Sequence, residues 1–151
     1  MVKLVEFTGP SGAGKSHYLR QHMADYANYQ CVAKTSLADS FKTVWFLLRG
    51  GLSRAELCCL WQLTRGASSN PIRVLNLLRN VASKFYFHQR AVRTGTNLVQ
   101  DEGISHIPLI LMLHRVPQLA EVFFDTFSSW LSQIDVVLVE ASAEQVKARL
   151  Q

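Results

Sequence analysis

Gly9-Pro10-Ser11-Gly12-Ala13-Gly14-Lys15-Ser16 is the stretch that decides the fold, because it matches the pattern G-x-x-x-x-G-K-[ST] at every fixed position. The apolar run from Val2 to Thr8 before it predicts a β-strand, and the segment that begins at His17 predicts a helix. A plain glycine turn between a strand and a helix is the alternative interpretation. Such a turn gives no reason for Lys-Ser after the last glycine, so we expect this loop to hold the phosphates of a nucleoside triphosphate.

The chemistry of phosphate binding explains the composition of the loop. Its glycines allow backbone conformations that other residues avoid, so that several N–H groups can converge on an anion. Lys15 would add positive charge at the β- and γ-phosphates, Ser16 would offer its hydroxyl to Mg²⁺, and the backbone N–H of His17 would approach the α-phosphate. The expected nucleotide-binding residues are Gly9, Pro10, Ser11, Gly12, Ala13, Gly14, Lys15, Ser16 and His17.

The composition indicates one domain that spans residues 1–151, with 48% hydrophobic and 18% charged residues, which argues against disorder. The longest apolar run, Ile107 to Leu113, is too short to cross a bilayer, and the N-terminus lacks the pattern of a cleaved signal. The three cysteines show no metal-binding spacing and suit reduced thiols. We therefore expect a cytoplasmic protein that does not bind a membrane. The net charge of +5 suits a nucleic-acid partner or a pocket for phosphorylated small molecules.

Strands and helices alternate along the chain, which predicts a three-layer α/β/α domain with a parallel sheet. The expected strands are Lys3–Thr8, Cys31–Lys34, Asn97–Gln100 and Ile134–Glu140, the last of them apolar enough to be buried on both faces. The expected helices are Ser16–Tyr29, Leu37–Arg49, one from Ser53 to near Gly66, Pro71–Arg93, Ile107–Leu113, Pro117–Leu131 and one from Ser142.

Helix-capping residues and apolar stripes support the longer helices. Ser53 and Glu56 are spaced as a capping box, and Asn70 followed by Pro71 is typical of a helix start. The expected core positions are Val74, Leu78, Val81, Phe85 and Val92 in one helix, and Leu119, Phe123, Phe127 and Trp130 in another.

Two carboxylates follow the third expected strand. Because open parallel sheets bind ligands at the carboxyl ends of their strands, Asp101 should lie beside the phosphate loop and share Mg²⁺ with Ser16. Glu102 could orient water or an acceptor oxygen, so the expected catalytic residues are Lys15, Asp101 and Glu102. A solvated acidic loop is the alternative. His106 is the histidine expected to lie nearest this site.

The helix 71–93 carries five cations and no acidic residue between Arg73 and Arg93. Arg79, Arg90 and Arg93 share one face and are candidates for binding the phosphate of an acceptor, and Arg73 and Lys84 share a second face. For any single residue, a solvated basic face is the simpler interpretation. No interleaving of aromatic and basic residues along the sequence supports nucleic-acid binding, so we do not expect nucleic acid as a partner.

The phosphate loop with its flanks Phe7-Thr8, the segments Ala91–Gly95 and Leu98–Asp101, and the run from Ile134 to Leu150 together resemble P-loop nucleoside and nucleotide kinases, above all thymidylate-kinase-type proteins. The resemblance is thin outside the loop. It implies a strand order of 2-3-1-4, with a fifth strand beyond the end of the chain. In that family an Asp-Arg pair usually follows the third strand, whereas this chain has Asp101-Glu102. An arginine-bearing lid would follow Gln151, so we expect either a C-terminal truncation or a protein that lacks the lid and the last strand.

The sequence leads to three hypotheses about function. The first is an ATP- and Mg²⁺-dependent phosphotransferase of the nucleoside or nucleotide kinase type that acts on a small acceptor. The second is a P-loop ATPase whose hydrolysis drives a partner, and the third is a nucleotide-binding regulatory domain. ATP is favoured because the Asn/Thr-Lys-x-Asp element of guanine-specific proteins is absent. The expected partners are a nucleoside triphosphate and a phosphoryl acceptor, and homodimerisation is left open.

Overall fold

The strands form one parallel sheet in a computed structural model that describes residues 2–9, 13–22, 24–32, 36–67, 70–108, 117–140 and 142. The sheet order is β2-β3-β1-β4, and every pair of neighbours is parallel. This confirms the order implied by the family resemblance. The strands are β1 (Leu4–Thr8), β2 (Tyr29–Val32), β3 (Asn97–Asp101) and β4 (Ile134–Leu138).

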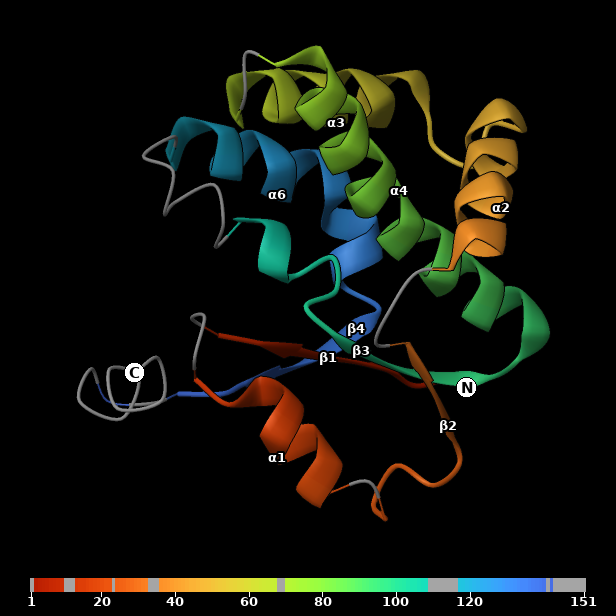
Figure 1. The fold of residues 1–151 in the computed structure, drawn as a ribbon, viewed down its shortest axis with the longest axis vertical. Helices are drawn as coiled ribbons and strands as arrows, with labels where there is room; N and C mark the ends of the chain where they lie inside the picture. Colours follow the sequence, from red (N-terminus) through yellow and green to blue (C-terminus); the bar gives the residue numbers. More distant parts are fainter. Residues whose placement is uncertain are drawn as a thin grey trace.

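Helices cover both faces of the sheet, as Figure 1 shows. One face carries α1 (Lys15–Gln21), and the other carries α2 (Leu37–Leu48), α3 (Arg54–Ala67), α4 (Pro71–Thr94) and α6 (Pro117–Leu131). This arrangement is compatible with a three-layer α/β/α fold. Among the described helices, none is both long enough and apolar enough to span a membrane.

The predicted helix starts are confirmed. The Asn70 side chain accepts hydrogen bonds from two N–H groups of the first turn of α4, and Pro71 occupies the first turn. Gly95, at φ 66°, ends α4 in the left-handed conformation that glycine adopts without strain. The backbone N–H of Ser53 donates to Glu56 at 2.6 Å and the N–H of Glu56 donates to Ser53 Oγ at 3.2 Å, so the capping box ahead of α3 also forms.

The main core lies between the sheet and the α3–α4–α6 layer. Phe85 of α4 packs on Phe127 of α6 with ring centroids 4.7 Å apart, and Phe123 lies beside Phe127 at 4.6 Å. Most of the predicted stripe on α4 is buried or partly buried, but Val92 is exposed and Ala91 is buried in its place. The prediction for Val92 was wrong because the buried face ends at Ala91, where α4 packs on the start of the sheet.

The predicted helix Ser16–Tyr29 is much shorter in the structure. α1 ends at Gln21, residues 22 and 24–28 form turns, and Tyr29 begins β2. The Tyr26 ring meets Phe7 of β1 edge-on at 5.7 Å and Tyr29 at 5.3 Å. This aromatic packing beneath the sheet outweighs the helix-compatible sequence. The described part of β2 ends at Val32, before the predicted end at Lys34, which lies outside the described residues.

The prediction that the fourth strand is buried on both faces was wrong. Among the strands of the described residues, β4 lies at one edge of the sheet beside β1, and Val136 and Leu138 are 50% and 58% exposed. An apolar run indicates that a strand prefers burial, but it does not indicate whether one face or both faces of that strand are covered. The strand also ends at Leu138 instead of Glu140. Residues 106–108 are helical, and the remainder of the predicted helix Ile107–Leu113 and the helix after Ser142 lie outside the described residues.

Candidate functional site

The sheet register brings the end of β1, where the glycine-rich motif begins, next to the acidic pair. Phe7 of β1 is opposite Asp101 of β3, so both strands end at the same edge. Gly9 follows β1 with φ 148°, and a Cβ there would overlap the carbonyl oxygen of Val139. Gly9 therefore has to be glycine, which fits its fixed place in the motif. Pro10, Ser11 and Gly12 lie outside the described residues.

Ser16 and Asp101 meet at this edge, as predicted. Ser16 Oγ donates a hydrogen bond to Asp101 Oδ2. Asp101 Oδ1 is buried and has no hydrogen-bond partner within the described structure. A buried carboxylate oxygen without a donor is costly unless it meets a cation or another polar ligand. Ser16 Oγ and Asp101 Oδ1 could therefore act as two oxygen ligands of one cation.

Lys15 lies against the acidic pair from the start of α1, and only 6% of its surface is exposed. Its Nζ donates to the carbonyl of Gly9 at 3.0 Å and forms an ion pair with Glu102 Oε1 at 3.1 Å. Gly14, at φ 89°, turns the chain into the helix immediately before it. The positive charge of Lys15 is thus held between the Gly9 carbonyl and the Glu102 carboxylate.

Glu102 occupies a left-handed backbone conformation, with φ at 62°. Such a conformation is unfavourable for a non-glycine residue and is often retained at functional sites. Burial raises the pKa of Glu102, but the hydrogen bond from Lys15 and the charges of His106, Lys15 and Lys84 outweigh it, so the pKa lies below its usual value. Glu102 is therefore an ionised carboxylate at neutral pH and can accept a proton or orient a nucleophile.

His106 joins the site as expected. Its Nδ1 lies 3.1 Å from Thr8 Oγ1, and its Nε2 lies 3.8 Å from Glu102 Oε1. Burial lowers the pKa of His106; Glu102 opposes this shift, and the positive charges of Lys15 and Lys84 add to it. The imidazole is therefore neutral at pH 7.

Lys84 is a further charged residue near the site that the sequence motifs do not single out. This residue of α4 is partly buried, and burial lowers its pKa while the carboxylates of Glu6, Glu102 and Asp101 raise it. The charges of these carboxylates therefore act on a second lysine, which α4 supplies from the helical layer. Its neighbour Phe85 is buried in the core, and the position of Lys84 beside the apolar stripe is the signal in the sequence for an inward-facing lysine.

Glu6 was also missed, because it lies inside an otherwise apolar strand. It is 2% exposed, and its carboxylate accepts hydrogen bonds from the N–H groups of Ile104 at 2.9 Å and Ser105 at 2.7 Å. A Cβ at Gly103 would overlap this carboxylate. Glu6 therefore anchors the backbone that follows Glu102 and is a positioning residue for the site.

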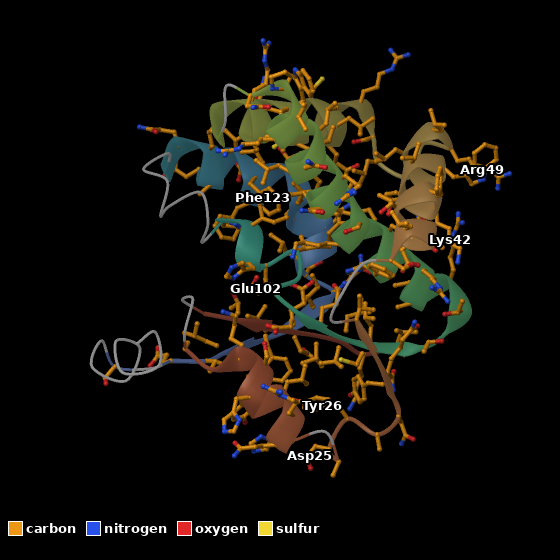
Figure 2. All side chains as sticks on the ribbon, in the orientation of Figure 1. Asp25, Tyr26, Lys42, Arg49, Glu102 and Phe123 are labelled. Atoms are coloured by element: carbon orange, nitrogen blue, oxygen red, sulfur yellow. The ribbon has the colours of Figure 1, made fainter. Side chains whose placement is uncertain are left out.

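The structure does not bring the three candidate arginines to this cluster. Arg79 is exposed on α4, where it donates to Asn80 Oδ1 at 3.3 Å. Arg90 and Arg93 line a groove between α2 and the last turns of α4. Because α4 leads into the start of β3, these turns lie at the amino end of that strand, whereas Glu102 follows its carboxyl end. Figure 2 shows Lys42 and Arg49 on α2, well away from Glu102.

His17 is exposed, and its backbone N–H donates to the carbonyl of Gly14 at 3.0 Å. In this structure that N–H is part of the first turn of α1. Its predicted contact with an α-phosphate stays a prediction. Ala13, the remaining loop residue in the described part, is buried.

We expect acid to destabilise the protein through His106. Its pKa is lowered in the folded chain, so the unfolded chain binds the proton more readily, and the free energy of unfolding should fall as the pH drops below about 6.5. His88, whose pKa burial also lowers, should act in the same direction. Urea unfolding at pH 7 and pH 5 should show a smaller loss of stability for His106→Gln than for the unaltered protein. An equal loss in the two proteins would contradict the assignment.

No protein-family model matches the chain, and no curated protein matches it either. The interpretation of the site therefore depends on the geometry of its own residues. In that geometry a loop lysine, a serine–aspartate pair and an ionised glutamate meet at one edge of a parallel sheet.

Proposed function

We propose that the protein is an ATP- and Mg²⁺-dependent phosphotransferase of the P-loop nucleoside or nucleotide kinase type, which transfers the γ-phosphoryl group to a small acceptor. The observation that carries the proposal is the hydrogen bond from Ser16 to Asp101, whose second carboxylate oxygen is buried without a donor in the described structure. Lys15 lies within the same cluster, in ion-pair contact with Glu102.

The residues present fit Mg²⁺ better than a metal held entirely by protein. Among the described residues, no group of three or more His, Cys, Asp or Glu side chains could hold a metal. Mg²⁺ usually binds one or two protein oxygens and takes its other ligands from water and phosphate. Ser16 and Asp101 would supply those oxygens, and the bound ion would neutralise charge on the phosphates.

The chain's own groups would act mainly by charge and position. Lys15 would stabilise negative charge on the transferred group, and it would exchange the carboxylate of Glu102 for phosphate oxygens. Glu102, ionised at neutral pH, would orient the acceptor hydroxyl or accept its proton. Lys84 is a second lysine whose charge acts on Glu102 and Asp101, so it is a better candidate for the phosphate of an acceptor than Arg79, Arg90 or Arg93.

ATP hydrolysis for a partner is the second candidate function. It is favoured by Glu102, which follows the aspartate in the place where the kinase family usually has arginine, and which lies 3.8 Å from the neutral imidazole of His106. In this case Glu102 would polarise a water molecule. A nucleotide-binding regulatory domain without turnover is the third candidate.

Release of ADP from ATP, measured with and without a panel of nucleosides and nucleoside monophosphates, separates these functions. We expect Mg²⁺-dependent release that rises with one class of acceptor. Release that no acceptor changes would favour the ATPase, and binding of ATP without release would favour the regulatory domain. Calorimetry that detects no ATP binding to the folded protein would refute all three. Asp101→Asn keeps the size of the side chain but removes its charge. This variant should therefore need a higher Mg²⁺ concentration for half-maximal ADP release.

A further inference from the structure

α2 presents apolar side chains to solvent along its whole length. The exposed residues recur on one face of the helix, and they are Leu37, Phe41, Val44, Trp45 and Leu48. Phe41 is 78% exposed and Trp45 is 56% exposed. Aromatic rings this exposed, one helical turn apart, are typical of a binding surface and not of a core.

A groove of about 850 Å³ runs beside this face, between α2 and the last turns of α4. Cations and aromatic rings alternate along its walls. α2 contributes Phe41, Lys42, Trp45, Phe46 and Arg49, and α4 contributes Tyr86, Gln89, Arg90, Arg93 and Thr94. All of the lining residues are described, and none of them is acidic. Asp39, the nearby carboxylate that caps α2, interacts with the charges of Lys42 and Arg90 from outside the lining.

The rings and the cations are arranged as one surface. The guanidinium of Arg49 lies 4.7 Å from the centre of the Trp45 ring, and the Phe46 and Tyr86 rings meet at 6.1 Å at the boundary between the two helices. Arginine binds phosphate oxygens through paired N–H groups and also stacks on flat rings. A ligand that carries both phosphates and flat rings would satisfy the two components of the groove together.

We propose that this groove binds single-stranded nucleic acid. Its four cations, Lys42, Arg49, Arg90 and Arg93, would contact the phosphates of the strand. Unpaired bases would stack on Phe41 and Trp45, which lie about 6 Å apart along the helix axis. Gln89 and Thr94 supply polar groups within the groove. This binding would be independent of the phosphate loop, because Lys42 and Arg49 lie well away from Glu102 (Figure 2).

The charge and the shape of the groove favour a nucleic-acid strand over other occupants. A second copy of the chain docked through the same face would bring two sets of four cations together, and like charges repel. A flat lipid surface could contact the apolar face of α2 but could not enter the groove, where Tyr86, Arg90 and Arg93 line the α4 wall.

Fluorescence anisotropy of labelled 20-nucleotide dT and rU strands, titrated with the full chain, tests the proposal. We expect binding at 50 mM salt, and a logarithmic plot of affinity against salt with a slope between about −2 and −3 for four phosphate contacts. Phe41→Ala combined with Trp45→Ala should weaken binding by roughly tenfold or more, and Arg90→Gln combined with Arg93→Gln should weaken binding and make the slope shallower. A duplex of the same length should bind less tightly because its bases are already stacked.

Matched variants keep the test specific. Phe124→Ala removes an exposed ring of α6, and Arg79→Gln removes an exposed arginine of α4 outside the groove. Both should bind the strand as the unaltered protein does, and so should Lys15→Ala. Circular dichroism should show that every variant is folded.

Three results would overturn the proposal. The first is the absence of an anisotropy change at low salt. The second is an equal loss of binding in the groove variants and their controls. The third is that the protein binds no nucleic-acid strand, whereas replacing Phe41 and Trp45 alters its dimerisation or its binding to phosphatidylserine vesicles.

Discussion

Replacing Lys15 with alanine should lower ATP turnover about 100-fold or more, which is the scale of losing one charge-stabilising donor in an active site. Lys15 is 6% exposed and is held by the Gly9 carbonyl and by Glu102, so its charge lies inside the loop. Its removal also leaves the Glu102 carboxylate without its closest cation, and the pKa of Glu102 should rise. Steady-state ADP release measured at several pH values follows the turnover and the change in the pKa of Glu102, and calorimetric titration with ATP and Mg²⁺ measures the ATP affinity.

Lys3→Ala is the matched control for Lys15→Ala. The Lys3 side chain is exposed, and the contact of this residue with Asn97 is made by its backbone N–H, which the substitution keeps. The control should retain both turnover and ATP affinity. If Lys15→Ala remained folded and turned over ATP at the rate of the control, the proposed function would be wrong.

Replacing Glu6 with alanine should lower the free energy of unfolding by about 3–5 kcal/mol, because two hydrogen bonds to a charged group are lost and two N–H groups remain inside the protein. Those N–H groups belong to Ile104 and Ser105, which follow Glu102 and Gly103. Folded domains are stable by about 5–15 kcal/mol, so much of the stability would go. Urea unfolding followed by circular dichroism measures the change.

Glu121→Ala provides the comparison, because Glu121 is exposed on α6. It should change stability by less than about 0.5 kcal/mol, as most surface substitutions do. Glu6→Gln keeps one acceptor oxygen and should fall between the two variants. A Glu6→Ala protein as stable as Glu121→Ala would show that the buried carboxylate does not anchor the segment after Glu102.

Local signals in the sequence were sufficient for the sheet and for part of the site. The motif and the apolar run before it predicted β1, and Asn70, Pro71, Ser53 and Glu56 predicted helix starts because capping depends on residues close in sequence. The pairing of Ser16 with Asp101 followed from a general property of parallel sheets, whose strands present their carboxyl ends at one edge.

Features that depend on layers far apart in sequence could not be predicted in the same way. The exposure of β4 depends on its position at the edge of the sheet, and the short α1 depends on Tyr26 packing against Phe7. The influence of the acidic pair on Lys84 depends on the packing of α4 against the sheet, which residues distant in sequence determine. The aromatic and basic residues Phe41, Lys42, Trp45 and Arg49 do lie close together in sequence, but the groove also needs Arg90 and Arg93, about 45 residues later, and only the packing of α2 on α4 brings the two segments together.

α4 contributes to both surfaces. Lys84 interacts with the carboxylates at the phosphate loop, and Arg93 lines the groove nine residues later, about 13 Å along the same helix axis. Were α4 to tilt as one rigid rod, both surfaces would move together. Suppose that a bound nucleic-acid strand changed the affinity of the protein for nucleotide through such a tilt. Thermodynamic reciprocity then requires that bound nucleotide change the affinity for the nucleic acid by the same factor.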